Sequence, residues 1–317
     1  MKSETLKQSQ FDFGFASMNK HNVQFVDDFL SLFDEEFKLY FFIASKIEYL
    51  VLQLFAEYKS NFYFDADAMK YSITKSLVMY RPEKVIDCIF SSTESFVDVL
   101  KEFFRERIKC NKENIALKRR ESQAFEAILC YLENVSVVPK LDWTYYMAFD
   151  GFRKYLKEEI IADYFLTLDK EGKEGQESKT LQAVRLMGLQ NTTEVDSLSS
   201  CGVRVADMIA GIMTRLLKAL CASLRYHSPE DGVQKKVLAV KWFQMNEDQL
   251  RLYKKLYKII CEWDHAWYKS YAGIYSDDLV TFIALLNYMN HFESVKQIHD
   301  EGLNMQGEYF NSFACKQ

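Results

Sequence analysis

The sequence predicts an α/β protein in which a small sheet is enlarged by helical insertions and followed by a helical C-terminal region. Only 11 Gly and 3 Pro occur among 317 residues, and this scarcity of chain-breaking residues favours long helices. Short runs rich in aromatic or β-branched residues alternate with helical patterns and provide the candidate strands. The stretch 164–220 combines both signals, because it reads as strand, turn, helix, strand and helix.

The N-terminal segment carries two of the candidate strands. Phe11, Phe13 and Phe15 alternate along the chain, and Gly14 between them indicates a bulge or a close backbone approach. The run 38–44 is short, aromatic and continuous, which predicts a strand buried on both faces. Apolar residues at helical spacing predict helices on either side of this second strand, over 22–37 and 46–58.

A helical block is expected as an insertion at about residues 65–160. Its predicted elements are helices at 67–80, 93–109, 111–132 and 145–160, with 85–90 either a strand or a helical turn. Pro82 ends the first of these helices, because the proline ring disfavours helical geometry at Arg81.

The remaining elements complete the first domain and form the C-terminal region. Strands are predicted at 164–168 and 192–196 and helices at 180–187 and 203–226, so residues 1–226 form one domain. Gly188 follows the shorter helix, where a glycine adopts the left-handed conformation easily. In the region 227–317, Asn246 and Gln249 form a capping-box pattern, and residues 276–290 have the signature of a helix start.

Familiar cofactor and catalytic motifs are missing from the chain. The seven cysteines lie at least twenty residues apart without a C-x-x-C pair, so a zinc site has no support and reduced thiols are expected. The glycine-rich phosphate loops, the G-x-S-x-G elbow and the H-E-x-x-H pair are also absent from the sequence. No apolar run approaches the ~20 residues of a spanning helix, and the polar N-terminus has no signal-peptide pattern. We therefore expect a cytoplasmic protein that does not enter a membrane.

Four carboxylates stand where strands end or inside the long helix that follows. Asp169 and Glu171 come after the strand 164–168, and Asp196 ends the strand 192–196. Asp207 lies on the edge of an apolar helical stripe next to Ala206, Ala210 and Gly211, small residues that would let the helix approach the sheet and shield the carboxylate from solvent. The stripe consists of Val203, Ala206, Ala210, Met213, Leu217 and Leu220. Acids delivered to one sheet edge by different elements could share a divalent cation, and Mg²⁺ needs only one or two direct carboxylates.

Each of these acids also has a structural explanation. An Asp after a strand commonly takes part in turn chemistry, and an exposed Glu is commonly a solvated loop residue. For Asp207 an ion pair with Arg204 or Arg215 is as good an interpretation as a metal ligand. The functional hypothesis therefore depends on the four acids acting in combination.

Positive charge is concentrated in residues 212–260, although the chain has a net charge of −5. This segment holds ten Lys or Arg against four Asp or Glu, with aromatic residues between them. Basic side chains can contact phosphates while aromatic side chains stack on bases. Solvated helix faces packed on an aromatic core would produce the same pattern. The candidate nucleic-acid-binding residues are Arg215, Lys218, Arg225, Lys235, Lys236 and Lys241.

The segment 195–215 resembles the C-terminal signature of the family called domain of unknown function 3800. The resemblance rests on the residues Asp196–Ser197, on Gly202 and on the A-D-x-x-A-G run at 206–211, and it extends over about residues 1–225. It implies a ribonuclease-H-like fold with a mixed sheet and a nuclease site that uses Mg²⁺ or Mn²⁺. By position it implies Asp169 and Asp207 as metal ligands, with Asp196 and Glu171 as further catalytic candidates.

The chain departs from this family at its first strand. Members usually open with a D-E-S-G motif that supplies a central metal ligand, and this motif is absent from the sequence. Either an upstream strand precedes Met1 or the central acid has been lost. The first case predicts a metal-dependent nuclease acting on DNA or RNA. The second predicts a non-catalytic interaction or scaffolding protein, for instance in a bacterial or phage conflict system, whose aromatic surface contacts a protein partner.

Overall fold

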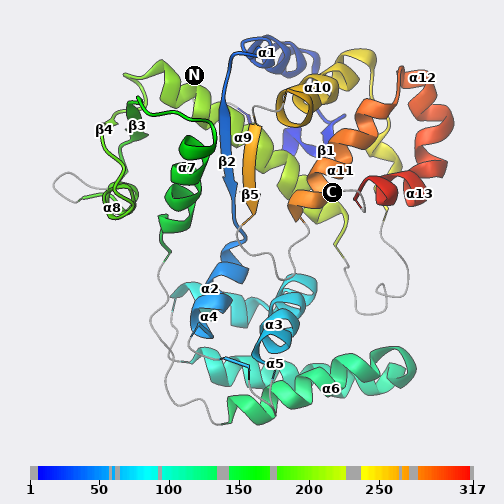
Figure 1. Ribbon diagram of the computed structural model, residues 1–317. Helices are drawn as coiled ribbons and strands as arrows, with labels where there is room; N and C mark the ends of the chain where they lie inside the picture. The colour runs from blue at the N-terminus through cyan, green and yellow to red at the C-terminus, as the bar shows by residue number, and fades with distance from the viewer. Residues whose placement is uncertain are drawn as a thin grey trace.

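The chain has three hydrophobic cores. In Figure 1 the first core forms the upper body, the second forms the lower helical lobe, and the third lies beside the upper body. The structure is a computed structural model that describes residues 6–56, 59–60, 65–91, 95–133, 143–171, 177–225, 237–263, 266–270 and 278–314. The mixed α/β class expected from the sequence is confirmed. None of the helices in this part of the chain is long and apolar enough to cross a membrane.

The first core joins the N-terminal segment to the C-terminal region. Buried side chains from residues 6–41 pack with others from residues 208–298, so the region expected at 227–317 shares its core with the start of the chain. The elements of this core are β1 (Asp12–Phe15), α1 (Lys20–Leu30), α9 (Cys201–Ser223), α10 (Glu247–Tyr257), α11 (Asp278–His291), α12 (Val295–Gln297) and α13 (Leu303–Ala314). Short 3-10 and π-helical segments extend or join them at Gln8–Gln10, Val240–Trp242, Lys258–Glu262 and Ile298–Gly302.

The second core forms the lower helical lobe. The helices predicted at 67–80, 93–109 and 111–132 lie here, whereas the one predicted at 145–160 belongs to the third core. Residues 85–90, left open between strand and helix, are helical. The five helices are α2 (Lys46–Leu54), α3 (Ala66–Tyr80), α4 (Glu83–Ser91), α5 (Phe96–Asn111) and α6 (Ile115–Leu132), with a 3-10 turn at Lys112–Asn114. Helix α3 ends at Tyr80, as expected from Pro82, and Arg81, the residue that caps it, adopts the left-handed conformation.

The third core is small and lies beside the upper body. It contains α7 (Tyr146–Glu158), β3 (Leu166–Asp169), α8 (Lys179–Leu186) and β4 (Thr192–Val195). Strands β3 and β4 pair in parallel, with Asp169 opposite Val195. Gly188 has a φ of +69° after α8, in agreement with its predicted place at the helix C-terminus.

The other strand pair crosses the middle of the upper body. Strand β2 (Leu39–Ile43) pairs in parallel with β5 (Ala266–Ser270), which comes from the C-terminal region (Figure 1). Within the described residues the two pairs remain separate two-stranded sheets. The prediction that 38–44 is buried on both faces is wrong, because within β2 only Phe41 is buried. The C-terminal end of the strand instead lines a cavity.

Candidate functional site: a basic cleft between the cores

Two of the predicted acids lie at one edge of the β3–β4 pair. The parallel register places Asp169 at the end of β3, and Asp196 follows β4 at the same edge. Both side chains are exposed, and Asp196 accepts a hydrogen bond from the Leu198 backbone N–H at 2.8 Å, which is turn chemistry. These two carboxylates are the donors that this edge offers to a cation.

The other two acids lie on different elements. Glu171 accepts hydrogen bonds from Tyr145 Oη at 3.3 Å and from Thr180 Oγ1 at 2.6 Å. Asp207 is on α9, and the expectation that it is shielded from solvent is wrong, because its side chain is exposed. In the described part of the chain, no group of three or more His, Cys, Asp or Glu residues is arranged to hold a metal ion.

Only part of the apolar stripe expected on helix α9 faces the core, since Val203, Met213 and Leu220 are buried as expected. We expected the small residues Ala206 and Ala210 to pack inward, but both are exposed. Larger side chains are buried in the first core, among them Ile209, one residue before Ala210, and Ile212, two residues after it. Since large apolar groups gain more free energy on burial than alanine, they set the orientation of the helix. The small residues and Asp207 are therefore left on its exposed side.

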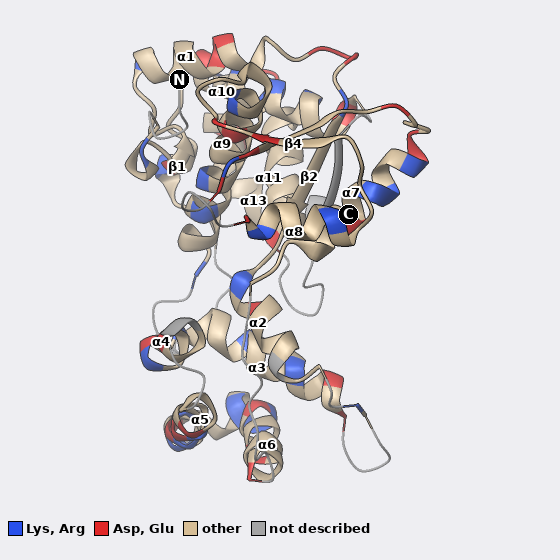
Figure 2. Ribbon diagram, turned by 90° about the vertical axis from the view of Figure 1, so that its left-hand side faces the viewer, with Lys and Arg blue, Asp and Glu red and all other residues tan. Residues whose placement is uncertain are grey.

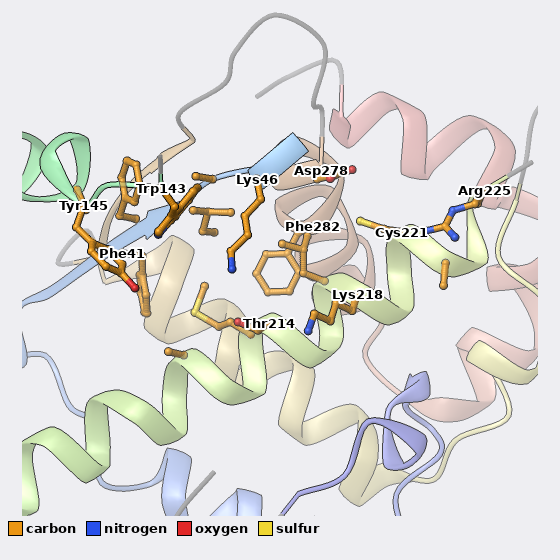
Figure 3. Close-up of a pocket in the computed structure, with 18 of the residues that line it drawn as sticks. Phe41, Lys46, Trp143, Tyr145, Thr214, Lys218, Cys221, Arg225, Asp278 and Phe282 are labelled. Atoms are coloured by element: carbon orange, nitrogen blue, oxygen red, sulfur yellow. The ribbon is translucent and has the colours of Figure 1, made fainter. Parts of the chain in front are cut away.

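The exposed side of α9 forms one wall of the largest described cavity, about 830 Å³, which we call the basic cleft. Figure 2 shows the upper body joined to the lower lobe near α2. The residues of the cleft come from β2, α2, α7, α9 and α11 and from the chain just after α3 and just before α7 (Figure 3). Its size is within the range of about 300–1,000 Å³ typical of ligand sites. The side chains that define the basic cleft are Phe41, Lys46, Arg81, Trp143, Tyr145, Thr214, Lys218, Cys221, Arg225, Asp278 and Phe282.

Local structure brings Lys46 into the cleft. Strand β2 ends at the cleft, and the Ser45 side chain caps α2 by accepting a hydrogen bond from the Glu48 N–H. Lys46 is therefore the first residue of α2, and in Figure 3 its side chain extends into the cavity. Its amino group lies 5.4 Å from the centre of the Trp143 ring, a cation–π contact. Crevices at the C-terminal ends of parallel strands are common ligand sites.

Positive charge dominates the cleft. Four cations, Lys46, Arg81, Lys218 and Arg225, line it against a single carboxylate, Asp278. Within the described residues none of these cations forms an ion pair. Four cations that share a cavity with one carboxylate leave an excess of positive charge, so the cleft is suited to an anionic ligand.

Cys221 is not a nucleophile in this environment. Burial and the neighbouring Asp278 carboxylate, to which the thiol donates a hydrogen bond, raise the pKa of Cys221 to about 12. A thiol with this pKa stays protonated at neutral pH, whereas the thiolate is the reactive form. The cleft therefore offers binding groups rather than covalent chemistry at this position.

A second cavity, about 600 Å³, continues from the cleft along α9. The two cavities share Ala210, Thr214 and Lys218, and the second adds Lys7, Arg215 and Asp207. Together they form a surface path that we call the basic track. Its cations are Lys7, Arg215, Lys218, Lys46, Arg225 and Arg81.

The track includes some of the predicted nucleic-acid-binding residues and some that sequence reasoning missed. Arg215, Lys218 and Arg225 lie on it. Lys241 does not line either cavity, and its amino group lies 5.0 Å from the centre of the Phe13 ring. Lys235 and Lys236 lie outside the described residues. The missed residues are Lys46, Arg81, Trp143 and Tyr145. Only Lys46 had a usable signal, because it begins the helix predicted at 46–58, just after the predicted strand 38–44.

Comparisons with protein-family models, curated proteins and solved structures found no match for the chain. The resemblance of residues 195–215 to the family named above therefore stays a prediction. The chemistry of the basic cleft is the basis on which function can be inferred.

Proposed function

We propose that this protein binds single-stranded nucleic acid along the basic track. The observation that carries the proposal is the set of four cations without ion pairs beside Trp143 and Tyr145 in one cleft. Lys and Arg contact phosphates, and aromatic rings stack on bases irrespective of their sequence. A single strand is favoured over a duplex, because its bases are free to reach aromatic rings that line a cavity.

The length of the track favours a polymer over a single nucleotide. Its cations extend from Lys7 and Arg215 in the second cavity to Arg81 and Arg225 in the cleft, and Lys218 lines both cavities. A mononucleotide would occupy only part of this path. The net charge of −5 leaves the rest of the surface unfavourable for nucleic acid, so binding is expected to be confined to the track.

Fluorescence anisotropy with labelled dT and U oligonucleotides tests the proposal. We expect Lys46→Gln and Lys218→Gln each to weaken binding about fivefold, the equivalent of roughly 1 kcal/mol for an exposed charge. Each variant should also lower the slope of log affinity against log salt by about 0.7, because one phosphate contact is lost.

The matched control is Lys109→Gln, which removes an exposed lysine in α5, outside both cavities. It has the same effect on net charge and should keep the affinity of the wild type. Equal losses in Lys109→Gln and Lys218→Gln would show that net charge rather than the track governs binding. Failure of the wild type to bind any oligonucleotide would refute the proposal. It would favour the alternative that this chain is a non-catalytic protein that contacts a protein partner.

A second candidate function is metal-dependent cleavage of the bound strand, favoured by the position of Asp207. This carboxylate lines the second cavity together with Arg215 and Lys218, so a strand on the track would pass beside it. Mg²⁺ or Mn²⁺, if bound, would activate water and stabilise the leaving oxygen. With this second candidate function we also propose a ribonuclease-H-like fold, in which acids at a sheet edge and on a helix hold the metal ion. It is supported by the parallel pair that gathers Asp169 and Asp196 at one edge.

A further inference from the structure

A smaller cavity, about 170 Å³, adjoins one end of the basic cleft. It shares Arg81, Cys221, Arg225 and Asp278 with the cleft and is otherwise lined by Val78, Met79, Leu220, Leu224 and Thr281. Figure 3 shows Arg225 and Cys221 at the end of the cleft opposite Trp143 and Tyr145. The cavity is smaller than the roughly 300–1,000 Å³ of typical ligand sites, so it can hold a chemical group but not a further nucleotide.

Two guanidinium groups meet at this small cavity. Burial, followed by the charge of the neighbouring Arg81, lowers the pKa of Arg225. In the described part of the chain neither arginine forms an ion pair, although Asp278 lines the same cavity. The Asp278 carboxylate accepts a hydrogen bond from the Cys221 thiol, and its charge offsets part of the effect of Arg81 on the pKa of Arg225. The repulsion between the arginines would be relieved by an anion that binds both of them.

The backbone at Arg81 is strained in a way that fits a role for its side chain. Arg81 has φ of 44° and ψ of 58°, and its N–H donates a hydrogen bond to the Leu77 carbonyl at 3.1 Å. A side chain other than Gly costs about 1 kcal/mol or more in this left-handed conformation, and Gly or Asn occupies such helix ends with less strain. An arginine in this place brings a guanidinium to the lining of the cavity.

We infer that Arg81 and Arg225 recognise a terminal phosphate of the bound strand. This inference rests on the proposed function and names the part of the ligand that the small cavity holds. An internal phosphodiester carries one negative charge, whereas a terminal phosphomonoester carries about −1.5 to −2 at neutral pH. Arginine binds phosphate oxygens through paired N–H groups, so two arginines match a terminal phosphate better than a diester.

Competition binding with three oligonucleotides of one sequence tests this inference. One carries a 5′-phosphate, one a 3′-phosphate and one a hydroxyl at both ends, and EDTA is present throughout. We expect the wild type to bind one of the two phosphorylated strands about tenfold tighter than the hydroxyl strand, as charged hydrogen bonds allow. The end that is preferred gives the direction of the strand on the track.

Variants separate recognition of the end from binding to the track. Arg81→Gln and Arg225→Gln should each lose the preference for the phosphorylated strand. Lys218→Gln should weaken binding of all three strands by the same factor and keep the preference. Thermal unfolding of each variant confirms that it is folded, and Arg81→Gln leaves the left-handed strain unchanged.

The outcomes distinguish this inference from the proposed function. Equal binding of the three strands by the wild type, or a preference that survives in both arginine variants, would overturn the inference alone. Failure to bind any strand would overturn the proposed function as well. A competitor, dTMP, that binds as tightly as the phosphorylated strand would assign the arginine pair to a free nucleotide instead of a strand end.

Discussion

Gly14 lies where the backbone of β1 passes closest to the aromatic side chains of the first core. Its φ is +61°, and a Cβ at this position would overlap Tyr253 Oη and lie 2.5 Å from the Trp242 ring. The neighbouring Phe15 N–H donates a hydrogen bond to the same tyrosine hydroxyl at 3.1 Å. The close backbone approach predicted from the sequence is confirmed, but its partners come from the far end of the chain.

The substitution Gly14→Ala is expected to lower the free energy of unfolding by about 3 kcal/mol. Left-handed strain contributes about 1–2 kcal/mol and overpacking of the core about 1–3 kcal/mol. Urea denaturation measures the change. The matched control is Gly188→Ala, where φ is +69° but no atom lies within 4 Å of the added Cβ. The free energy of unfolding of that variant should fall only by the contribution of left-handed strain. Equal losses in the two variants would show that the contact with Tyr253 and Trp242 has no cost.

At the scale of elements, Asp27 ties α1 to α10. Its carboxylate lies 2.8 Å from Lys255 Nζ and 3.2 Å from Arg251 Nε. Burial acts to raise the pKa of Asp27, but the hydrogen bonds from Lys255 and Arg251 outweigh it and hold the pKa below the ordinary value of 3.8. A carboxyl whose pKa is lower in the folded state stabilises the fold above its unfolded pKa. This contribution is lost as the pH falls through the folded pKa.

Replacing Asp27 by Asn should therefore destabilise the protein at neutral pH and matter less in acid. We expect a loss of about 1 kcal/mol at pH 7, because the pair is partly exposed to solvent. The difference from the wild type should shrink as the pH falls below about 4, measured by urea unfolding at each pH. Asp28→Asn removes an exposed carboxylate from the next position of α1 and serves as the control. A difference that stays constant with pH would contradict the ion-pair explanation.

Elements were predicted well where their signals are local. The capping box of Asn246 and Gln249 forms as expected, with hydrogen bonds of 3.0 and 2.8 Å. Helix α9 shows the limit of local signals, since its extent was predicted closely but its buried face only in part. Several stripes of α9 are apolar enough to be buried, and the choice among them depends on the partner surface.

At the scale of the whole molecule, the proposed cleavage site depends on how α9 lies relative to the β3–β4 pair. If cleavage occurs, Asp207→Asn should abolish it in Mn²⁺ while leaving strand binding and thermal unfolding unchanged. Asp169→Asn tests whether the edge of the β3–β4 pair takes part in cleavage. If only one of the two variants loses cleavage, the metal ion is assigned to the element that carries the replaced residue. Gel assays of a labelled oligonucleotide measure both. Absence of cleavage by the wild type with Mn²⁺ and Mg²⁺ would leave a binding protein without nuclease activity.

The sequence by itself determined the α/β class, most helices and strands, and the concentration of basic residues that includes Lys218 and Arg225. These properties follow from the spacing of apolar residues, from caps and from composition, which act over a few residues. Only the tertiary structure decided that β5 pairs with β2, that Asp207 is exposed, and that Lys46, Arg81 and Trp143 line one cleft. The physical reason is that this cleft lies between the first and the second hydrophobic cores, and the packing of these cores depends on contacts between distant parts of the chain.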